Sequence, residues 1–349
     1  MNGKTLLIVL AMLASFVSIP AIGADKAPIT VAVSIRTVSN EYQMQYVAGA
    51  QAFIDSLPEG TAELRLLSCE ASDDKQINDI DDLIKEKGKN AILFIDPNSA
   101  RNLIDIAELC ETGEIYWSSA WNIPSDINPL QYKYWVTHQA CDGVKQGYDI
   151  ATELFSRFET PGEGNLLVLQ GMLSNTANTT RMQGFTQALM ESEVVILETQ
   201  ACDWDSDRAK AVMENWLTVY DDIDGVWCAN DNMALGAIEA LTAAGLNGKV
   251  KVVGVNGVSE AVNAIESGDM VCSIGNNGWL QAGYGLAYAH AALIGKISTE
   301  KLERRQRIFH TNGIMINNSN IDTYRRDFLD NAPVYDYSDL DFPIAKEMK

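Results

Sequence analysis

Short apolar runs alternate with longer segments of helical spacing along most of this chain. In the first half, the apolar runs that predict strands are residues 29–34, 64–67, 91–95 and 115–118. Between them, apolar residues three or four positions apart predict helices at 41–56, 72–86 and 100–110. The run at 91–95 (AILFI) is apolar throughout, which is typical of a parallel strand buried on both faces.

The same alternation restarts in the second half. Strands are predicted at 166–169, 194–197, 225–228 and 250–255, and helices at 142–158, 181–190, 208–220, 233–244 and 259–267. Residues 123–134 contain Pro124 and Pro129 and follow neither period, so we interpret them as the connection between two units. Because 349 residues also exceed one typical core, the sequence predicts two α/β lobes, each with a parallel sheet covered by helices.

The first residues have the pattern of a secretory signal peptide. Lys4 gives a positive start, residues 6–19 form a nearly unbroken apolar run, and small residues at 21–24 suit cleavage. The run is shorter than the roughly 20 apolar residues that a membrane-spanning helix needs. We therefore expect a signal peptide at residues 1–24, cleavage near Ala24 and an exported protein.

Composition and motifs exclude several classes of function. A net charge of -21 repels nucleic-acid phosphates and anionic membrane surfaces, so we expect no nucleic-acid partner. The three histidines, His138, His290 and His310, lack metal-ligand spacing, and the chain has no nucleophile elbow or phosphate-binding glycine loop. We therefore expect no enzyme, no metal site and no cofactor. Six widely spaced cysteines leave both disulfides and buried free thiols open.

Polar and aromatic residues recur where the predicted strands end. In open α/β sheets, ligands bind beyond the carboxyl ends of the strands. Amides and hydroxyls donate and accept hydrogen bonds as sugar hydroxyls do, and aromatic faces pack against the apolar face of a sugar ring. The candidate binding residues at these positions are Asn40, Tyr42, Ser119, Trp121, Thr179, Trp204, Asn230, Asn256 and Asn276. Together they predict one polar cleft for a neutral ligand with several hydroxyl groups.

Each candidate also has a purely structural interpretation. Asn230 and Asn256 stand where a side chain caps the following helix, and Tyr42 and Trp204 are large enough to be core residues. Their recurrence at successive strand ends is what favours binding.

Residues 229–237 (ANDNMALGA) resemble a strand-to-helix turn of the type I periplasmic sugar-binding proteins, the family of ribose-binding protein. Residues 253–257 (VGVNG) look like the next strand end of that family, and residues 181–185 (RMQGF) are similar to its R-x-x-G-F helix start. Residues 203–205 resemble its aromatic residue flanked by aspartates. The resemblance extends from about residue 29 to residue 320.

The resemblance implies two Rossmann-like lobes with parallel sheets, joined by a three-crossing hinge that closes on the ligand. We expect one lobe from residues 25–136 plus 276–311 and the other from 137–275 plus 312–349. The family further implies stacking by Tyr42 and Trp204 and hydrogen bonds from the amides, with Ser119 and Thr179 nearby. Arg181 either reaches the ligand or braces its loop.

Three positions depart from the family pattern. Ser119 stands where the family often has Asp, Asn256 also replaces an Asp, and Thr179 replaces an Arg of the ribose-binding relatives. Charge-assisted hydrogen bonds are about twice as strong as neutral ones, so these losses argue against ribose. Arg36, in the first loop, either recognises an acidic sugar or is exposed.

Two functions follow from the resemblance. The protein is either the periplasmic solute-binding subunit of an ABC importer, with a permease as partner, or a sensor whose closed form engages a membrane sensor kinase or chemoreceptor. Residues 324–349 extend beyond the usual family end and loosely resemble the longer autoinducer-2 receptors, or else they form a strap packed on one lobe. A transcription factor of the lactose-repressor type would share these lobes, but it needs an N-terminal helix-turn-helix. Because the predicted signal peptide occupies that place, the sequence argues against this third function. We expect a monomer.

Overall fold

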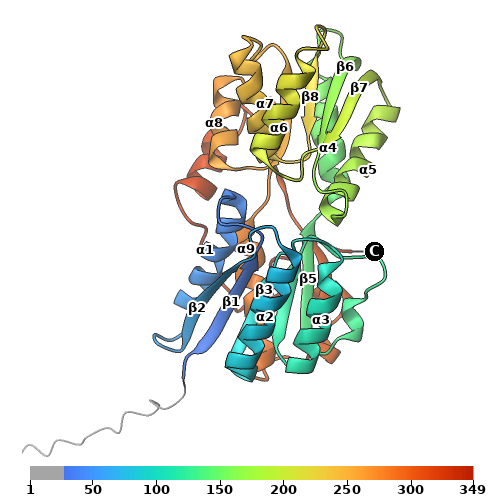
Figure 1. Ribbon diagram of the computed structural model, residues 1–349. Helices are drawn as coiled ribbons and strands as arrows, with labels where there is room; N and C mark the ends of the chain where they lie inside the picture. Colours follow the sequence, from blue (N-terminus) through green and yellow to red (C-terminus); the bar gives the residue numbers. More distant parts are fainter. Residues whose placement is uncertain (1–26, 349) are drawn as a thin grey trace, which may run out of the picture.

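The computed structural model describes residues 27–348, so the predicted signal peptide lies outside the described residues. Two α/β lobes lie one above the other (Figure 1). The first sheet has the order β13-β11-β5-β4-β3-β1-β2, and only β13 runs antiparallel to its neighbour. Its strands are β1 (Ile29–Ile35), β2 (Ala62–Ser68), β3 (Ala91–Ile95), β4 (Tyr116–Ala120), β5 (Trp135–Cys141), β11 (Ile308–Thr311) and β13 (Lys346–Glu347).

Helices cover both faces of this first sheet. One pair packs on one face and the other pair on the opposite face, as Figure 1 shows. The pairs are α1 (Glu41–Asp55) with α9 (Gly278–Leu293), and α2 (Asp73–Lys87) with α3 (Asn102–Gly113). All five residues of β3 are buried between them, as its unbroken apolar run predicts.

The second lobe repeats this architecture. Its sheet has the order β12-β10-β9-β8-β6-β7, with only β12 antiparallel. The strands are β6 (Glu163–Gln170), β7 (Glu193–Ala201), β8 (Gly225–Cys228), β9 (Lys251–Asn256), β10 (Cys272–Gly275) and β12 (Ile314–Ile316). The helices are α4 (Gly143–Phe155), α5 (Thr176–Met190), α6 (Ser206–Trp216), α7 (Asp231–Ala243) and α8 (Ser259–Ser267). The predicted fold class, two parallel α/β lobes, is confirmed.

Polar residues start most of these helices. In each case a side-chain oxygen accepts a backbone N–H of the first turn, which satisfies a group that the helix itself leaves unpaired. The capping residues are Asn40, Ser72, Asp142, Asp205, Asn230 and Asn277. Since helices follow strands here, the caps lie at the strand ends where the candidate binding residues were predicted.

The lobe boundaries differ from the expected ones in the first half of the chain. Residues 123–134 do not connect the lobes, because β4 and β5 on either side of them pair in the first sheet. The whole of β5 belongs to that sheet, so the first passage to the second lobe comes after Cys141 rather than at residue 136. The two prolines mark a loop within one lobe.

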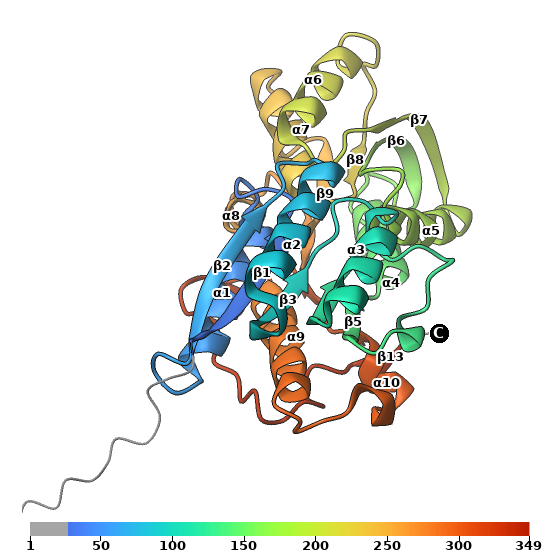
Figure 2. The same ribbon diagram turned by 60° about the horizontal axis from the view of Figure 1, so that its bottom comes forward.

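The tail also departs from expectation. Residues 312–349 were expected in the second lobe, and β12 and α11 (Ile321–Tyr324) do pack there, against β10 and α8. The chain then returns to the first lobe, where β13 pairs with β11 at the edge of the first sheet (Figure 2). Aromatic packing drives the return, because Tyr335, Tyr337 and Phe342 surround Tyr284 of α9. Within residues 27–348 the chain therefore passes between the lobes four times and not three.

Two further observations concern the described residues as a whole. No helix within residues 27–348 is long and apolar enough to cross a membrane. The cysteines of this part of the chain are all buried free thiols, namely Cys69, Cys110, Cys141, Cys202, Cys228 and Cys272.

Candidate ligand-binding site

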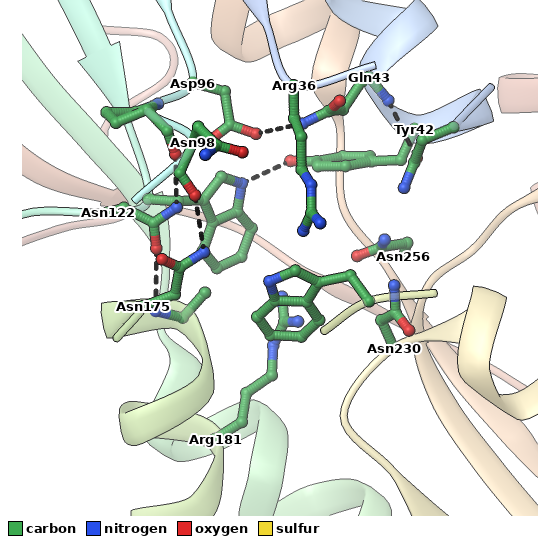
Figure 3. Close-up of a pocket in the computed structure, with 15 residues that line it drawn as sticks. Arg36, Tyr42, Gln43, Asp96, Asn98, Asn122, Asn175, Arg181, Asn230 and Asn256 are labelled. Atoms are coloured by element: carbon green, nitrogen blue, oxygen red, sulfur yellow. Dashed lines mark hydrogen bonds between the residues drawn. The ribbon is translucent and has the colours of Figure 1, made fainter. Parts of the chain in front are cut away.

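A cavity lies between the lobes, where the carboxyl ends of strands from both sheets face each other (Figure 3). It encloses about 520 Å³, including part of its opening to solvent. From the first lobe it is lined by Arg36, Asn40, Tyr42, Gln43, Asp96, Pro97, Asn98, Trp121 and Asn122. From the second lobe it is lined by Asn175, Ala177, Arg181, Trp204, Asn230 and Asn256.

The structure brings most of the predicted candidates to this cavity. Those that line it are Asn40, Tyr42, Trp121, Arg181, Trp204, Asn230 and Asn256. Ser119 does not, because it is buried in β4, where its hydroxyl lies 2.8 Å from His138 Nδ1 and accepts from Trp135 Nε1 at 3.0 Å. Thr179 is exposed on α5 and donates to the Thr176 carbonyl.

Asn276 stands behind the cavity wall. Its Nδ2 donates to Asn256 Oδ1 at 3.2 Å, and its own Oδ1 accepts from Gln146 Nε2 at 2.6 Å. Asn276 therefore holds a cavity residue instead of lining the cavity.

The first lobe presents hydrogen-bond acceptors. Asp96 is 7% exposed, and its Oδ2 accepts from Gln43 Nε2 at 2.9 Å. Asn98 donates through Nδ2 to Asp73 Oδ1 at 2.6 Å. The second oxygen of Asp96 and the Oδ1 of Asn98 are buried without a hydrogen-bond partner among residues 27–348. Burial without a partner is unfavourable for such groups, so both oxygens are available to a ligand that donates.

The Asp96 carboxyl has an unusual protonation equilibrium. Burial raises its pKa to about 7, although the hydrogen bond from Gln43 and the charges of Arg36 and Arg181 act in the opposite direction. This group therefore titrates near neutral pH.

Two aromatic rings, of Tyr42 and Trp121, also line the first-lobe wall. The Tyr42 hydroxyl donates to Gln281 Oε1 at 2.5 Å and accepts from Trp121 Nε1 at 2.8 Å. The polar ends of both side chains are thus engaged within the protein. Their contribution to the cavity is ring surface, as stacking requires.

The second lobe presents amide donors. Asn230 Oδ1 accepts from Met233 N at 3.0 Å and caps α7, while Asn256 Oδ1 accepts from Asn276. Within the described chain neither Nδ2 group has a protein acceptor. For Asn230, capping and cavity lining are therefore both observed, and they use different ends of the amide.

Arg181 joins the two walls. Its guanidinium carbon lies 4.8 Å from the ring centroid of Trp121 and 5.8 Å from that of Trp204. Its Nε donates to Gln146 Oε1 at 3.2 Å and its Nη1 to the Ala229 carbonyl at 2.9 Å. Burial lowers the pKa of Arg181 to about 10, so it remains charged at neutral pH. It both lines the cavity and braces the surrounding loops.

Trp204 is held in position by its backbone. Asp203 and Trp204 have φ values of 52° and 68°, in the left-handed region that few residues adopt. Gly171 permits the close approach of the ring, because a Cβ at residue 171 would lie 2.1 Å from it. Arg36 donates from the other lobe to the Asp203 carbonyl at 3.0 Å, so it is a cavity residue and not simply an exposed one.

The lobes also touch directly around the cavity. Ser259 donates to Glu41 through its N–H at 3.1 Å and its hydroxyl at 2.5 Å, and Thr176 donates to the Ile123 carbonyl at 2.7 Å. Each of these bonds joins a residue of one lobe to a residue of the other. The lobes are therefore in a closed arrangement.

Several lining residues were missed by sequence reasoning, most importantly Asp96 and Asn98. Asp96 follows β3 directly and Asn98 comes two residues later, so the strand-end rule that identified Asn230 also applies to them. Gln43 lies inside α1, where nothing in the sequence distinguishes a cavity residue from a surface one.

A cavity of this kind, between two parallel α/β lobes and lined by amides, a carboxylate and aromatic rings, defines a two-lobed binding protein for a small polar molecule. Within residues 27–348, no cluster of His, Cys, Asp or Glu could hold a metal ion. The chain belongs to the periplasmic binding protein family, whose domain (described as "Periplasmic binding protein domain") matches residues 31–297. The predicted family is thus confirmed.

Individual relatives agree with this assignment. The ribose import binding protein RbsB of Salmonella typhimurium is 30% identical over 277 residues, covering 78% of this chain and 87% of that protein. A xylitol-binding protein of Mycolicibacterium smegmatis is 36% identical over 137 residues, which span only 39% of each chain.

Solved structures are also similar. The structure of a twin-arginine translocation pathway signal protein from Burkholderia phytofirmans is 33% identical, with a TM-score of 0.87, covering 92% of this chain and 99% of that one. A periplasmic solute-binding protein of an ABC transporter from Actinobacillus succinogenes, solved with D-allose, has a TM-score of 0.73 at 22% identity, covering 85% and 100%. At 22% identity, the similarity to the Actinobacillus structure supports the fold alone.

Proposed function

We propose that this protein captures a neutral sugar or polyol in the periplasm and delivers it to an ABC importer. The observation that carries the proposal is the arrangement of acceptors and donors around the cavity. Asp96, Asn98 and Asn175 each have a buried oxygen without a partner among the described residues, and Asn230 and Asn256 offer amide N–H groups. A hydroxyl group donates and accepts at once, so a polyhydroxylated ligand can satisfy both sets.

The comparisons support the same ligand class. Relatives are named for ribose, allose and xylitol binding. Arg36 and Arg181 both donate to the protein itself, to the Asp203 and Ala229 carbonyls, and Asp96 offsets part of their charge, so neither guanidinium depends on an acidic sugar for a partner.

A thermal-shift panel tests the proposal. Xylitol, D-ribose, D-allose and the anion D-gluconate are each added to the purified protein at millimolar concentration. A ligand present at about 100 times its dissociation constant stabilises the fold by about 2.7 kcal/mol. We expect a neutral compound to stabilise Asn98→Ala clearly less than the wild type, and to stabilise the matched control Asn247→Ala, an exposed position, as much as the wild type. Stabilisation by gluconate alone, or by none of a widened polyol panel, would overturn the proposal.

Transport is favoured over sensing, because the Salmonella relative, which matches 78% of this chain, is an import binding protein. We further propose export through a cleaved signal peptide, hinge closure on the ligand, a monomeric state and no catalytic activity. Uptake of the radiolabelled ligand by cells lacking this protein tests transport. Wild-type uptake in those cells would favour a sensor kinase or chemoreceptor as the partner.

A further inference from the structure

Tyr324, at the end of α11 in the tail, lies directly behind the second-lobe wall of the cavity. It is 3% exposed, and its hydroxyl donates to the Gly257 carbonyl at 3.1 Å. A Cβ added at Gly257 would lie 2.4 Å from the Tyr324 hydroxyl, and one added at Gly275 would lie 2.5 Å from the ring. The tyrosine therefore packs against the bare backbone of two glycines and does not itself line the cavity.

The backbone that Tyr324 contacts carries a cavity residue in an unusual conformation. Asn256 has a φ of 141° and Gly257 a φ of 70°, and the first of these values is unfavourable for a residue with a side chain. Such a conformation persists only where its surroundings hold it. Here Asp231 Oδ2 accepts from the N–H groups of Gly257 at 2.6 Å and Val258 at 3.1 Å.

The Gly257 residue is thus held at both ends, by Asp231 at its N–H and by Tyr324 at its carbonyl. The buried Asp231 is a residue of the family-like turn, whereas Tyr324 comes from the tail. Phe328 stacks on the Tyr324 ring, with centroids 5.0 Å apart, and so helps to fix its position.

The same turn is connected to the hinge and to the other side of the cavity. Asn256 accepts from Asn276, Asn276 accepts from Gln146, and Gln146 accepts from Arg181. Asn276 lies in the passage between β10 and α9, immediately after Gly275, on which the Tyr324 ring rests. Displacing the ring would therefore disturb both Asn256 and the passage that carries its partner.

We propose that Tyr324 is a positioning residue for ligand binding, which holds the Asn256 turn in its binding conformation. The expected effect of Tyr324 on ligand affinity rests on the proposed function. The expected effect of Tyr324 on the conformation of the Asn256 turn does not depend on any ligand.

Hydrogen–deuterium exchange of the unliganded protein tests the local effect. The variant Tyr324→Phe removes only the hydroxyl, and Tyr288→Phe is a matched control, because the buried Tyr288 donates to the Leu340 carbonyl at 2.8 Å in the first lobe. We expect the amides of Gly257 and Val258 to exchange roughly fivefold faster in Tyr324→Phe and at the wild-type rate in Tyr288→Phe. Equal exchange in all three proteins would overturn the proposal.

A double-mutant cycle tests the effect on binding, with the most stabilising of xylitol, D-ribose and D-allose as probe. We expect Tyr324→Phe to weaken binding roughly threefold, but to have no further effect in the Asn256→Ala background, since it acts through Asn256. Additive losses would show that Tyr324 affects binding by another route and would overturn the assignment. If none of the probes binds the wild type, the proposed function fails, while the exchange experiment still decides the role of Tyr324.

Discussion

The two lobes supply chemically different halves of the cavity. In the first lobe, Asp96 and Asn98 use their other polar atoms within the protein and leave oxygens free to accept. In the second, Asn230 and Asn256 use their oxygens within the protein and leave amide N–H groups free to donate. The division has exceptions on both sides. Asn175 adds an acceptor from the second lobe and donates through Nδ2 to the Asn98 carbonyl at 3.3 Å, while Arg36 and Asn40, whose Oδ1 caps α1, add donors from the first lobe.

The lobes also differ in how these groups are held. Asp96 and Asn98 are fixed by single side-chain bonds to Gln43 and Asp73 in neighbouring helices of their own lobe. Asn256 depends on a strained turn, a buried aspartate and a tyrosine from the tail. The second-lobe donor Asn256 therefore depends on more distant parts of the chain than the first-lobe acceptors do.

Loss of the Asp96 carboxylate, in the first lobe, should reduce ligand affinity more than any other change considered below. We expect Asp96→Ala to weaken binding of the best polyol by about 2 kcal/mol, or roughly 30-fold, because a charge-assisted hydrogen bond is lost. Asp96→Asn keeps an oxygen acceptor and should lose less. Isothermal titration calorimetry measures the affinity of both variants. An unchanged dissociation constant for Asp96→Ala would show that Asp96 does not accept a hydrogen bond from the ligand.

Loss of a second-lobe donor should have a smaller effect, because an uncharged amide is involved. For Asn256→Ala we expect a loss of about 1.4 kcal/mol, or roughly tenfold in affinity. The exposed Asn247→Ala is the control, measured by the same calorimetry. If Asn256→Ala binds as tightly as the wild type, Asn256 only shapes its turn.

Ligand affinity should also depend on pH, because Asp96 is one of the first-lobe acceptors. The pKa of Asp96 is raised to about 7, so its carboxyl becomes protonated as the pH falls through that value. Ligand hydroxyls donate to the ionised form, and at pH 6 only about a tenth of the free protein carries it. Affinity should therefore be highest above pH 7 and fall by up to about tenfold between pH 8 and pH 6. A wild-type profile as flat as that expected of Asp96→Asn would contradict this account.

Weakening the contact between the lobes should have the smallest effect. Glu41 is half-buried and accepts from Ser259 across the cavity edge. We expect Glu41→Ala to weaken binding roughly threefold by favouring the open form. Small-angle scattering should show a larger radius of gyration for the unliganded variant than for the unliganded wild type. The same radius in both would mean that this contact does not govern closure.

Sequence reasoning succeeded where local patterns decide the structure. The apolar run of β3 and the cap at Asn230 depend on neighbouring residues alone, and the structure has both. The alternative that Asn256 caps the next helix is wrong, because α8 begins after Val258. Sequence reasoning missed Asp96, although the strand-end rule covers that position. It could not separate Ser119 from the cavity residues, because only the three-dimensional partners His138 and Trp135 place its hydroxyl inside the lobe.

The tail shows most clearly where such reasoning ends. Tyr335, Tyr337 and Phe342 follow neither a helical nor a strand period, and their common partner Tyr284 is some fifty residues earlier in the chain. Contacts of this range leave no local pattern, so the return to the first lobe could not be predicted.

The return of the tail has a consequence for converting this protein into an optical reporter. Because β1 and β13 belong to the same sheet, fluorophores attached next to Ile29 and Glu347 would move as one body and their energy transfer would stay constant during closure. Val334, which is 96% exposed, lies in the segment that leads from α11 back to the first lobe. A fluorescent domain inserted there, paired with a dye on α6 of the second lobe, would instead report the movement of one lobe relative to the other.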